Sequence, residues 1–269
     1  MSEIPRMKFC LVNGQRQEAQ PHLTGKCPVC DQVMVARCGK VNVWHWAHKG
    51  RRTCDPWWEN ETEWHRAWKN QFPPDWQERV RYAGDGERHI ADVETAHGWV
   101  IELQHSPISL EERRSRDAFY GQVVWVVDGT RRKTDSARFV RAWDNGTTVG
   151  RPHPVQRVHA DDCALLREWT DSLAPIFFDF GGQALAWLLP GRFNGFVYVT
   201  QIPRDQFIHI HRTGVVQEGV DFAGLVRELS QLVARVESPA LQAPPPPRQA
   251  TEANSNPNGP RIIRRRFRF

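Results

Sequence analysis

The sequence predicts an α+β fold in which a mixed β-sheet is flanked by helices. Three consecutive segments lead to this prediction. Residues 89–104 alternate polar and apolar side chains around a turn at His97 and Gly98, which is typical of a β-hairpin. Residues 109–120 begin with a serine cap and two glutamates, as helices often do. The apolar run at 122–128 predicts a fully buried strand.

The predicted hairpin brings three polar side chains together. Glu102 and Gln104 are two residues apart on one strand, so they project from the same face of the sheet. Asp92 lies on the preceding strand, and facing side chains of an antiparallel pair come within reach of one ion. Two carboxylates together with a phosphate oxygen suit a hard cation. We therefore expect Asp92 and Glu102 to bind Mg²⁺ or Mn²⁺, with Gln104 beside them.

Residues 59–72 predict a helix that the two following prolines end. Glu61, His65 and Lys69 lie four residues apart along one stripe of this helix. Taken alone, the stripe fits a solvated face of ion pairs. The apolar face of the same helix is expected to pack on the sheet.

One pair of cysteines and one pair of histidines predict a zinc-binding subdomain over residues 1–56. A Cys-x₂-Cys pair is separated by fourteen residues from the segment His-Trp-Ala-His. Such pairs can close tetrahedrally around zinc. The spacing differs from that of a DNA-reading C₂H₂ finger, and residues 33–37 and 42–45 between the pairs resemble strands, so we expect a structural zinc ribbon or knuckle. The expected ligands are Cys27, Cys30, His45 and His48, with Cys38 and Cys54 as spare candidates.

The motifs over about residues 25–130 resemble the competence protein CoiA-like branch of the PD-(D/E)XK nuclease superfamily. The resemblance rests on the cysteine and histidine cluster, the helix with Glu61, the hairpin, and the segments that follow it. It implies an α/β nuclease core over residues 57–150 in which Glu61 and His65 face the metal-binding carboxylates. Gln104 stands where the superfamily usually has a lysine that orients the attacking water. An amide can form hydrogen bonds but carries no charge.

The resemblance implies a Mg²⁺-dependent deoxyribonuclease that processes incoming, recombining or foreign DNA. Glu61, His65, Asp92, Glu102 and Gln104 would form its catalytic site. DNA would be its partner, together with other recombination, competence or defence proteins. Because of Gln104, the alternative is a catalytically inactive nucleic-acid-binding protein that contains zinc.

The pattern changes at about residue 151, and we expect a β-rich accessory region over 151–238. It would either extend the nuclease sheet or form a separate substrate-binding module. Its closing helix is indicated by an amphipathic stripe between residues 222 and 236. The expected strands cover residues 175–180, 184–189, 195–202 and 206–211.

Positive charge is concentrated at the C-terminal end of the sequence. The last nine residues contain five arginines, and removing these from the 36 basic residues leaves 31 basic against 31 acidic residues. Residues 239–260 are rich in Pro, Ala, Asn and Gln and predict a disordered linker, which makes 239–269 a linker with a basic tail. The tail would contact phosphate and stack on bases, or it would dock as a peptide on another protein. In the neutral body, DNA binding depends on local basic patches. The candidates are Arg51-Arg52, Arg79-Arg81, Arg113-Arg114-Arg116 and Arg131-Arg132-Lys133, and the single residues expected to contact DNA are Arg88, Arg116, Arg264, Arg265 and Arg266.

Composition points to a cytoplasmic protein. Six cysteines, two of them in a Cys-x₂-Cys pair, together with the lack of a signal-peptide start, indicate a reducing compartment. No apolar run approaches the length of a membrane span, so no membrane partner is expected. The sequence has no glycine-rich loop for nucleotide phosphates, so ATP-driven work is not expected.

Overall fold

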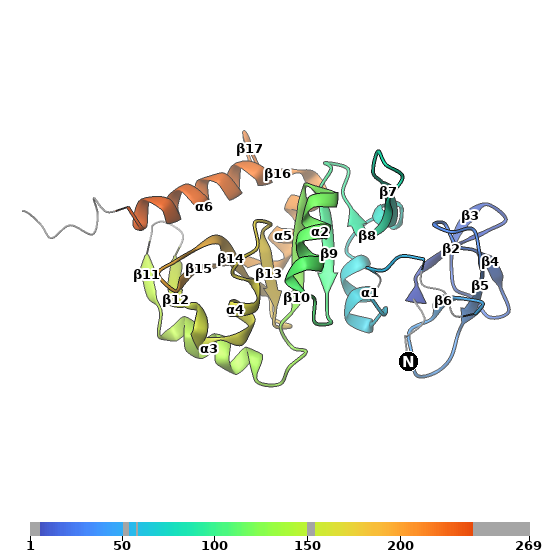
Figure 1. Ribbon diagram of the computed structural model, residues 1–269, viewed down its shortest axis with the longest axis horizontal. Coiled ribbons are helices and arrows are strands. Elements are labelled where there is room, and N and C mark those ends of the chain that lie inside the picture. Colours follow the sequence, from blue (N-terminus) through green and yellow to red (C-terminus); the bar gives the residue numbers. More distant parts are fainter. Residues whose placement is uncertain (1–5, 51–53, 58, 150–153, 239–269) are drawn as a thin grey trace, which may run out of the picture.

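The computed structural model describes residues 6–50, 54–57, 59–149 and 154–238. The predicted linker and basic tail, with Arg264, Arg265 and Arg266, lie outside the described residues, as do Arg51 and Arg52. A small N-terminal sheet lies at one end of the molecule and a large sheet fills the other, with α1 (Glu63–Lys69) between them (Figure 1). In this described part of the chain, no helix is both long and apolar enough to cross a membrane.

The N-terminal sheet contains six strands within the described residues, in the order β1-β6-β5-β4-β2-β3. All its pairings are antiparallel, and its core contains Met7, Met34 and Trp46. The strand predicted at 33–37 is confirmed, whereas the strand expected at 42–45 begins only at His45. The strands are β1 (Arg6–Met7), β2 (Phe9–Val12), β3 (Gln15–Glu18), β4 (Thr24–Lys26), β5 (Val33–Arg37) and β6 (His45–His48).

The large sheet contains nine strands of the described chain, in the order β11-β12-β15-β14-β13-β10-β9-β8-β7. The pairs β9–β10 and β10–β13 are parallel, and all others are antiparallel, so the predicted mixed sheet is confirmed. Its strands are β7 (Gln77–Tyr82), β8 (Arg88–Glu94), β9 (Val100–Gln104), β10 (Val123–Asp128), β11 (Thr147–Val149), β12 (Val155–His159), β13 (Ile176–Asp179), β14 (Ala184–Phe193) and β15 (Phe196–Pro203).

The central elements form where the sequence predicts them. Strands β8 and β9 make the expected hairpin, with Gly98 at φ +81° in the turn, where a glycine is favoured. Helix α2 (Leu110–Tyr120) begins after Ser109, whose side chain accepts a hydrogen bond from the Glu112 amide at 3.0 Å. Every residue of β10 is buried. Helix α1 is shorter than predicted, because Thr62 caps it three residues after the expected start.

The C-terminal strands β13, β14 and β15 join the same sheet, so this region extends it. The strand expected at 206–211 is wrong, because these residues belong to the helix α5 (Arg204–Thr213). Its buried residues Phe207, Ile210 and His211 follow helical spacing, and Gly214 at φ +76° ends the helix. The closing helix α6 (Phe222–Val236) is confirmed, after a short two-stranded sheet of β16 (Val215–Gln217) and β17 (Val220–Asp221).

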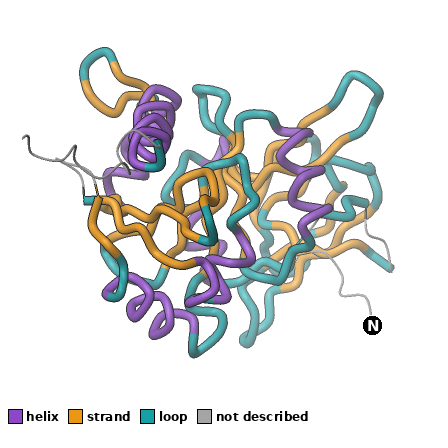
Figure 2. The backbone as a smooth tube through the Cα atoms, turned by 60° about the vertical axis from the view of Figure 1, so that its left-hand side comes forward, coloured by secondary structure: helices purple, strands orange, loops and turns teal. Residues whose placement is uncertain are grey.

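Helices cover both faces of the large sheet. One core joins Trp68 of α1 to Phe207 of α5, Phe222 of α6 and the β10 residues Val124 and Val126. A second core joins α3 (Asp135–Asp144) and α4 (Ala164–Trp169) to the alternate side chains of β10. Helices α3 and α6 therefore lie on opposite sides of the strands, as both views show (Figures 1 and 2).

Candidate metal-binding and active sites

The N-terminal sheet carries a compact cluster of Cys27, Cys30, His48 and Cys54. All four ligand atoms lie within 4.8 Å of one another. The two atoms Cys27 Sγ and Cys54 Sγ are 3.6 Å apart, and Cys30 Sγ lies 3.3 Å from His48 Nε2. Zinc bonds of about 2.3 Å to sulfur and about 2.0 Å to nitrogen in a tetrahedron give ligand separations of this size. The cluster therefore fits a closed structural zinc site.

The structure corrects one of the expected zinc ligands. His45 is not part of the cluster, and its Nδ1 atom lies instead 2.8 Å from the carbonyl oxygen of Val43. His45 and His48 are three residues apart on β6, so their side chains point to opposite faces of the sheet. Cys54, one of the two spare candidates, takes the fourth position, whereas Cys38 does not.

Hydrogen bonding and burial shift the pKa values of the three cysteine thiols in this cluster in different directions. The contact with Cys54 is the main cause that lowers the pKa of Cys27 to about 4. The same contact, together with burial, raises the pKa of Cys54, and burial raises the pKa of Cys30. One thiolate is thus strongly favoured, and the other thiols would release protons on binding zinc.

Asp92 and Glu102 face each other across the hairpin of the large sheet. The antiparallel register pairs Val93 with Ile101, so the adjacent residues Asp92 and Glu102 lie opposite each other. The Asp92 amide donates to Glu102 Oε1 at 3.4 Å, and the Leu103 amide donates to Asp92 Oδ2 at 3.0 Å. The structure thus brings the two predicted metal ligands together.

Each of these carboxylates also contacts a buried cation. Lys69 Nζ lies 3.1 Å from Asp92 Oδ1, and Arg116 donates to Glu102 Oε2 at 3.0 Å. Burial and repulsion from Asp92 raise the pKa of Glu102 to about 8, although Arg116 opposes this shift. Arg116, which was expected to contact DNA, is buried against Glu102 instead. Arg88 is exposed at the start of β8 and does not line the small pocket that contains Asp92 and Glu102.

Glu61, His65 and Lys69 are buried, so the interpretation of this helix stripe as a solvated face of ion pairs is wrong. Glu61 accepts hydrogen bonds from Lys69 Nζ and Arg66 Nε, both at 2.8 Å. Burial favours the protonated form of Glu61, but the charges of Lys69 and Arg66 keep its pKa below the ordinary value. Glu61 is therefore an ionised partner of the lysine.

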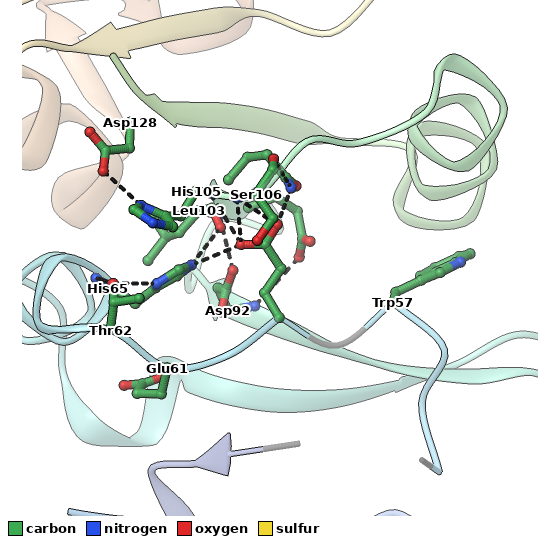
Figure 3. A network of polar contacts seen from close by, with 12 residues as sticks. Trp57, Glu61, Thr62, His65, Asp92, Leu103, His105, Ser106 and Asp128 are labelled. Atoms are coloured by element: carbon green, nitrogen blue, oxygen red, sulfur yellow. Dashed lines mark hydrogen bonds and ion pairs between the residues drawn. The ribbon is translucent and has the colours of Figure 1, made fainter. Parts of the chain in front are cut away.

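Glu59, which was not predicted as a site residue, also lines the pocket. Its contacts lie among His65, His105 and Ser106, which Figure 3 labels. Glu59 accepts hydrogen bonds from the amides of His105 and Ser106, each at 3.1 Å, and from the side chain of Gln104. His65 Nε2 lies 3.3 Å from Glu59 Oε2 and 3.1 Å from the Leu103 carbonyl oxygen. Burial opposes ionisation of Glu59, but its contact with His65 keeps its pKa below the ordinary value.

Gln104 lies at the edge of this arrangement. Its amide nitrogen donates to Glu59 and to the Ser106 carbonyl oxygen, the latter at 2.9 Å. Its oxygen is buried and finds no hydrogen-bond donor among the described residues. Gln104 therefore holds Glu59 in place, and no hydrogen bond joins it to Asp92 or Glu102 within the described structure.

Asp92, Glu102, Glu61 and His65 line one small pocket. The cavity volume of about 20 Å³ is enough for an ion or a water molecule but not for a nucleotide. The oxygens of Asp92 and Glu102 are the hard ligands that Mg²⁺ and Mn²⁺ prefer. The donor set therefore fits a hard divalent cation.

Comparison with known proteins defines the class of the N-terminal part. Residues 15–56 match the family model described as "Competence protein CoiA, N-terminal domain". The predicted CoiA-like resemblance is thereby confirmed for this N-terminal segment of the chain. The match includes all four residues of the cysteine and histidine cluster and ends before α1. No curated protein and no solved structure matches the chain significantly.

Proposed function

We propose that this protein is a metal-dependent nuclease that acts on DNA, in keeping with its CoiA-like N-terminal domain. The observation that carries the proposal is the pair Asp92 and Glu102, which face each other beside the buried Lys69. The order α1-β7-β8-β9-α2-β10 supports it, because the nuclease core implied by the sequence resemblance likewise has a helix before the hairpin, then a crossing helix and a buried strand.

In this proposal Asp92 and Glu102 bind Mg²⁺ or Mn²⁺. The bound cation would polarise the scissile phosphate and lower the pKa of a coordinated water molecule. Lys69 pairs with Asp92 and supplies, next to it, the positive charge that Gln104 lacks. His65, held by Thr62 at 2.8 Å and close to Glu59, is placed to accept or donate a proton.

The second candidate function is a zinc-containing protein that binds nucleic acid without cleaving it. The observation that favours it is that Lys69 and Arg116 already pair with the two carboxylates, while Gln104 bonds to Glu59. Metal dependence separates the two candidates. A binding protein would act without added Mg²⁺, whereas a nuclease would require it.

The test compares Asp92→Ala and Glu102→Ala with Glu94→Ala. Glu94 lies on the same strand as Asp92 and pairs with Arg81 outside the pocket, so it is a matched control. Wild type and control should cleave DNA only with Mg²⁺ or Mn²⁺, and each pocket variant should lose on the order of 100-fold or more of this activity. The substrates are single-stranded, duplex and branched DNA, with RNA as comparison.

Zinc content and circular dichroism should be the same in all four proteins. Undiminished cleavage by both pocket variants would show that the active site lies elsewhere. A wild-type protein that binds DNA but cleaves none of these substrates would favour the binding function.

A further inference from the structure

The small pocket lined by Asp92, Glu102, Glu61 and His65 is called the metal pocket below. A second, larger cleft of about 310 Å³ adjoins it. We call it the His105 cleft. His105 lies at the boundary between the two, because its amide donates to Glu59 while its ring lines the cleft. The ring centroids of His105 and His65 are 6.0 Å apart, and Figure 3 shows His105 between His65 and Asp128. A strand bound at the metal pocket would therefore reach this cleft.

Two arginines that line the His105 cleft have donors without acceptors. Arg113 Nε and Arg131 NH1 are buried and find no hydrogen-bond partner among the residues that the structure describes. Arg113 is only 2% exposed, and it is fixed by the ring of Trp169 at 4.7 Å and by the Glu168 carbonyl oxygen at 2.9 Å. Neither arginine forms an ion pair among the described residues, so two positive charges beside the cleft favour an anionic ligand.

The acidic groups of the cleft are already engaged. Glu168 accepts hydrogen bonds from both terminal nitrogens of Arg132, at 2.6 and 3.0 Å. Asp128 accepts from the Thr130 amide and from the Thr130 hydroxyl, and it lies 2.8 Å from His105 Nδ1. This contact holds Nδ1 as a donor, and Nε2 donates to an anion only when the ring is protonated. Because the carboxylates are engaged and Arg113 and Arg131 are not in ion pairs, the cleft is suited to an anion.

We infer that the His105 cleft binds a phosphate group of the DNA strand next to the phosphate at the metal pocket. Phosphate oxygens are acceptors that match arginine donors well. Arg131 and Arg113 provide the charged contacts, and His105 provides a further contact on the side of the metal pocket. The identity of the strand rests on the proposed nuclease function, but binding in the cleft does not require cleavage.

The test measures binding of a single-stranded 12-nucleotide DNA to the full-length protein without added divalent metal. Arg131→Gln is compared with Arg138→Gln, because Arg138 is exposed on α3, lies outside the candidate basic patches and does not line the cleft. Arg131→Gln should raise the Kd about tenfold, and it should flatten the slope of log Kd against log salt by about 0.7, the value for one phosphate contact on a single strand. Arg138→Gln should bind like wild type.

Thymidine 5′-monophosphate serves as a competitor that separates a strand from a free nucleotide. It should displace the oligonucleotide only at concentrations far above the oligonucleotide Kd. Displacement near that Kd, lost in Arg131→Gln, would identify a nucleotide site and overturn the inference. Equal Kd values for the two arginine variants would also overturn it.

These results are distinct from those of the cleavage assay. Cleavage that requires Asp92 and Glu102, with DNA binding that is insensitive to Arg131, would support the nuclease and reject the cleft. DNA binding that depends on Arg131, without any cleavage, would support the cleft and reject the nuclease.

Discussion

Lys69 joins three carboxylates at the centre of the metal pocket. Its ammonium group lies 2.8 Å from Glu61, 3.0 Å from Glu78 and 3.1 Å from Asp92. Burial favours the neutral amine, but the three negative charges raise the pKa of Lys69 well above its ordinary value. The residue is therefore charged, and its removal would leave buried acids without a partner.

Replacing Lys69 with methionine should lower the free energy of unfolding by about 3–5 kcal/mol, because it breaks a buried ion-pair network on one side only. Urea denaturation followed by circular dichroism measures the change. The control is Lys133→Met, since Lys133 is exposed and the change there should stay within about 0.5 kcal/mol. Equal unfolding free energies for both variants would contradict the structural role of Lys69.

His211 makes the stability of the protein depend on pH. Burial lowers the pKa of His211 from 6.5 to about 4, and its Nδ1 atom lies 2.8 Å from the Phe207 carbonyl oxygen. The folded state therefore keeps the ring neutral, whereas the unfolded chain binds a proton below pH 6.5. The stabilisation is complete above pH 6.5 and is lost as the pH falls towards 4.

Between these pH values, His211 should reduce the free energy of unfolding by about 1.4 kcal/mol per pH unit. Urea denaturation at several pH values should therefore show a steeper decline for wild type than for His211→Leu. Because both proteins keep the cysteine and histidine cluster, acid release of a metal bound there would affect them equally. Parallel curves for the two proteins would show that His211 does not titrate as described.

At the scale of single elements, β6 decides which histidine reaches the zinc cluster. The alternation of side chains along this strand turns His48 towards Cys30 and His45 away from it. The fourth ligand, Cys54, comes from the segment after the strand. The ligand set is therefore a property of the strand and its connection together.

Cys54→Ser should lose most of the bound zinc and unfold the N-terminal sheet, because metal binding at such a site contributes directly to folding. His45→Gln is the matched control and should retain about one equivalent. Elemental analysis of the purified proteins measures both. The reverse result, with zinc lost only in His45→Gln, would restore the ligand set expected from sequence.

At the scale of the whole molecule, two carboxylates connect the N-terminal sheet to the metal pocket. Glu78 accepts hydrogen bonds from the amides of Lys8 and Phe9 while it also pairs with Lys69. Asp55, next to Cys54 of the cysteine and histidine cluster, accepts from the Ile90 amide at 2.8 Å. Both connections lead towards Asp92, so the N-terminal part of the chain supports the pocket from outside.

Loss of zinc should therefore loosen strand β8. In Cys54→Ser, amide hydrogen exchange within Arg88–Glu94 should accelerate about tenfold for each 1.4 kcal/mol of lost local stability. Exchange in α6, at the far end of the molecule, should change much less (Figure 1). Hydrogen exchange with mass spectrometry measures both segments, and His45→Gln again is the control. Unchanged exchange in β8 would mean that the two parts are independent.

The sequence by itself determined the central hairpin, α2 and β10. These elements depend on local signals, namely side-chain alternation, a glycine in a turn, a serine cap and an apolar run. Asp92 and Glu102 could be predicted as neighbours because strand pairing fixes their positions once the turn is known. The Cys27 and Cys30 pair was likewise readable, since both ligands lie in one short segment.

Only the tertiary structure decided the partners of these residues. Cys54 replaced His45, and Glu59 and Lys69 joined the pocket, because their contacts come from segments that are distant in the sequence. Helix α5 formed where six residues of alternating pattern also fitted a strand. Packing of Phe207 on Phe177 of β13 and of His211 on Phe222 of α6 selected the helical period. Local pattern fixes an element, whereas burial against the rest of the chain fixes which side chains meet.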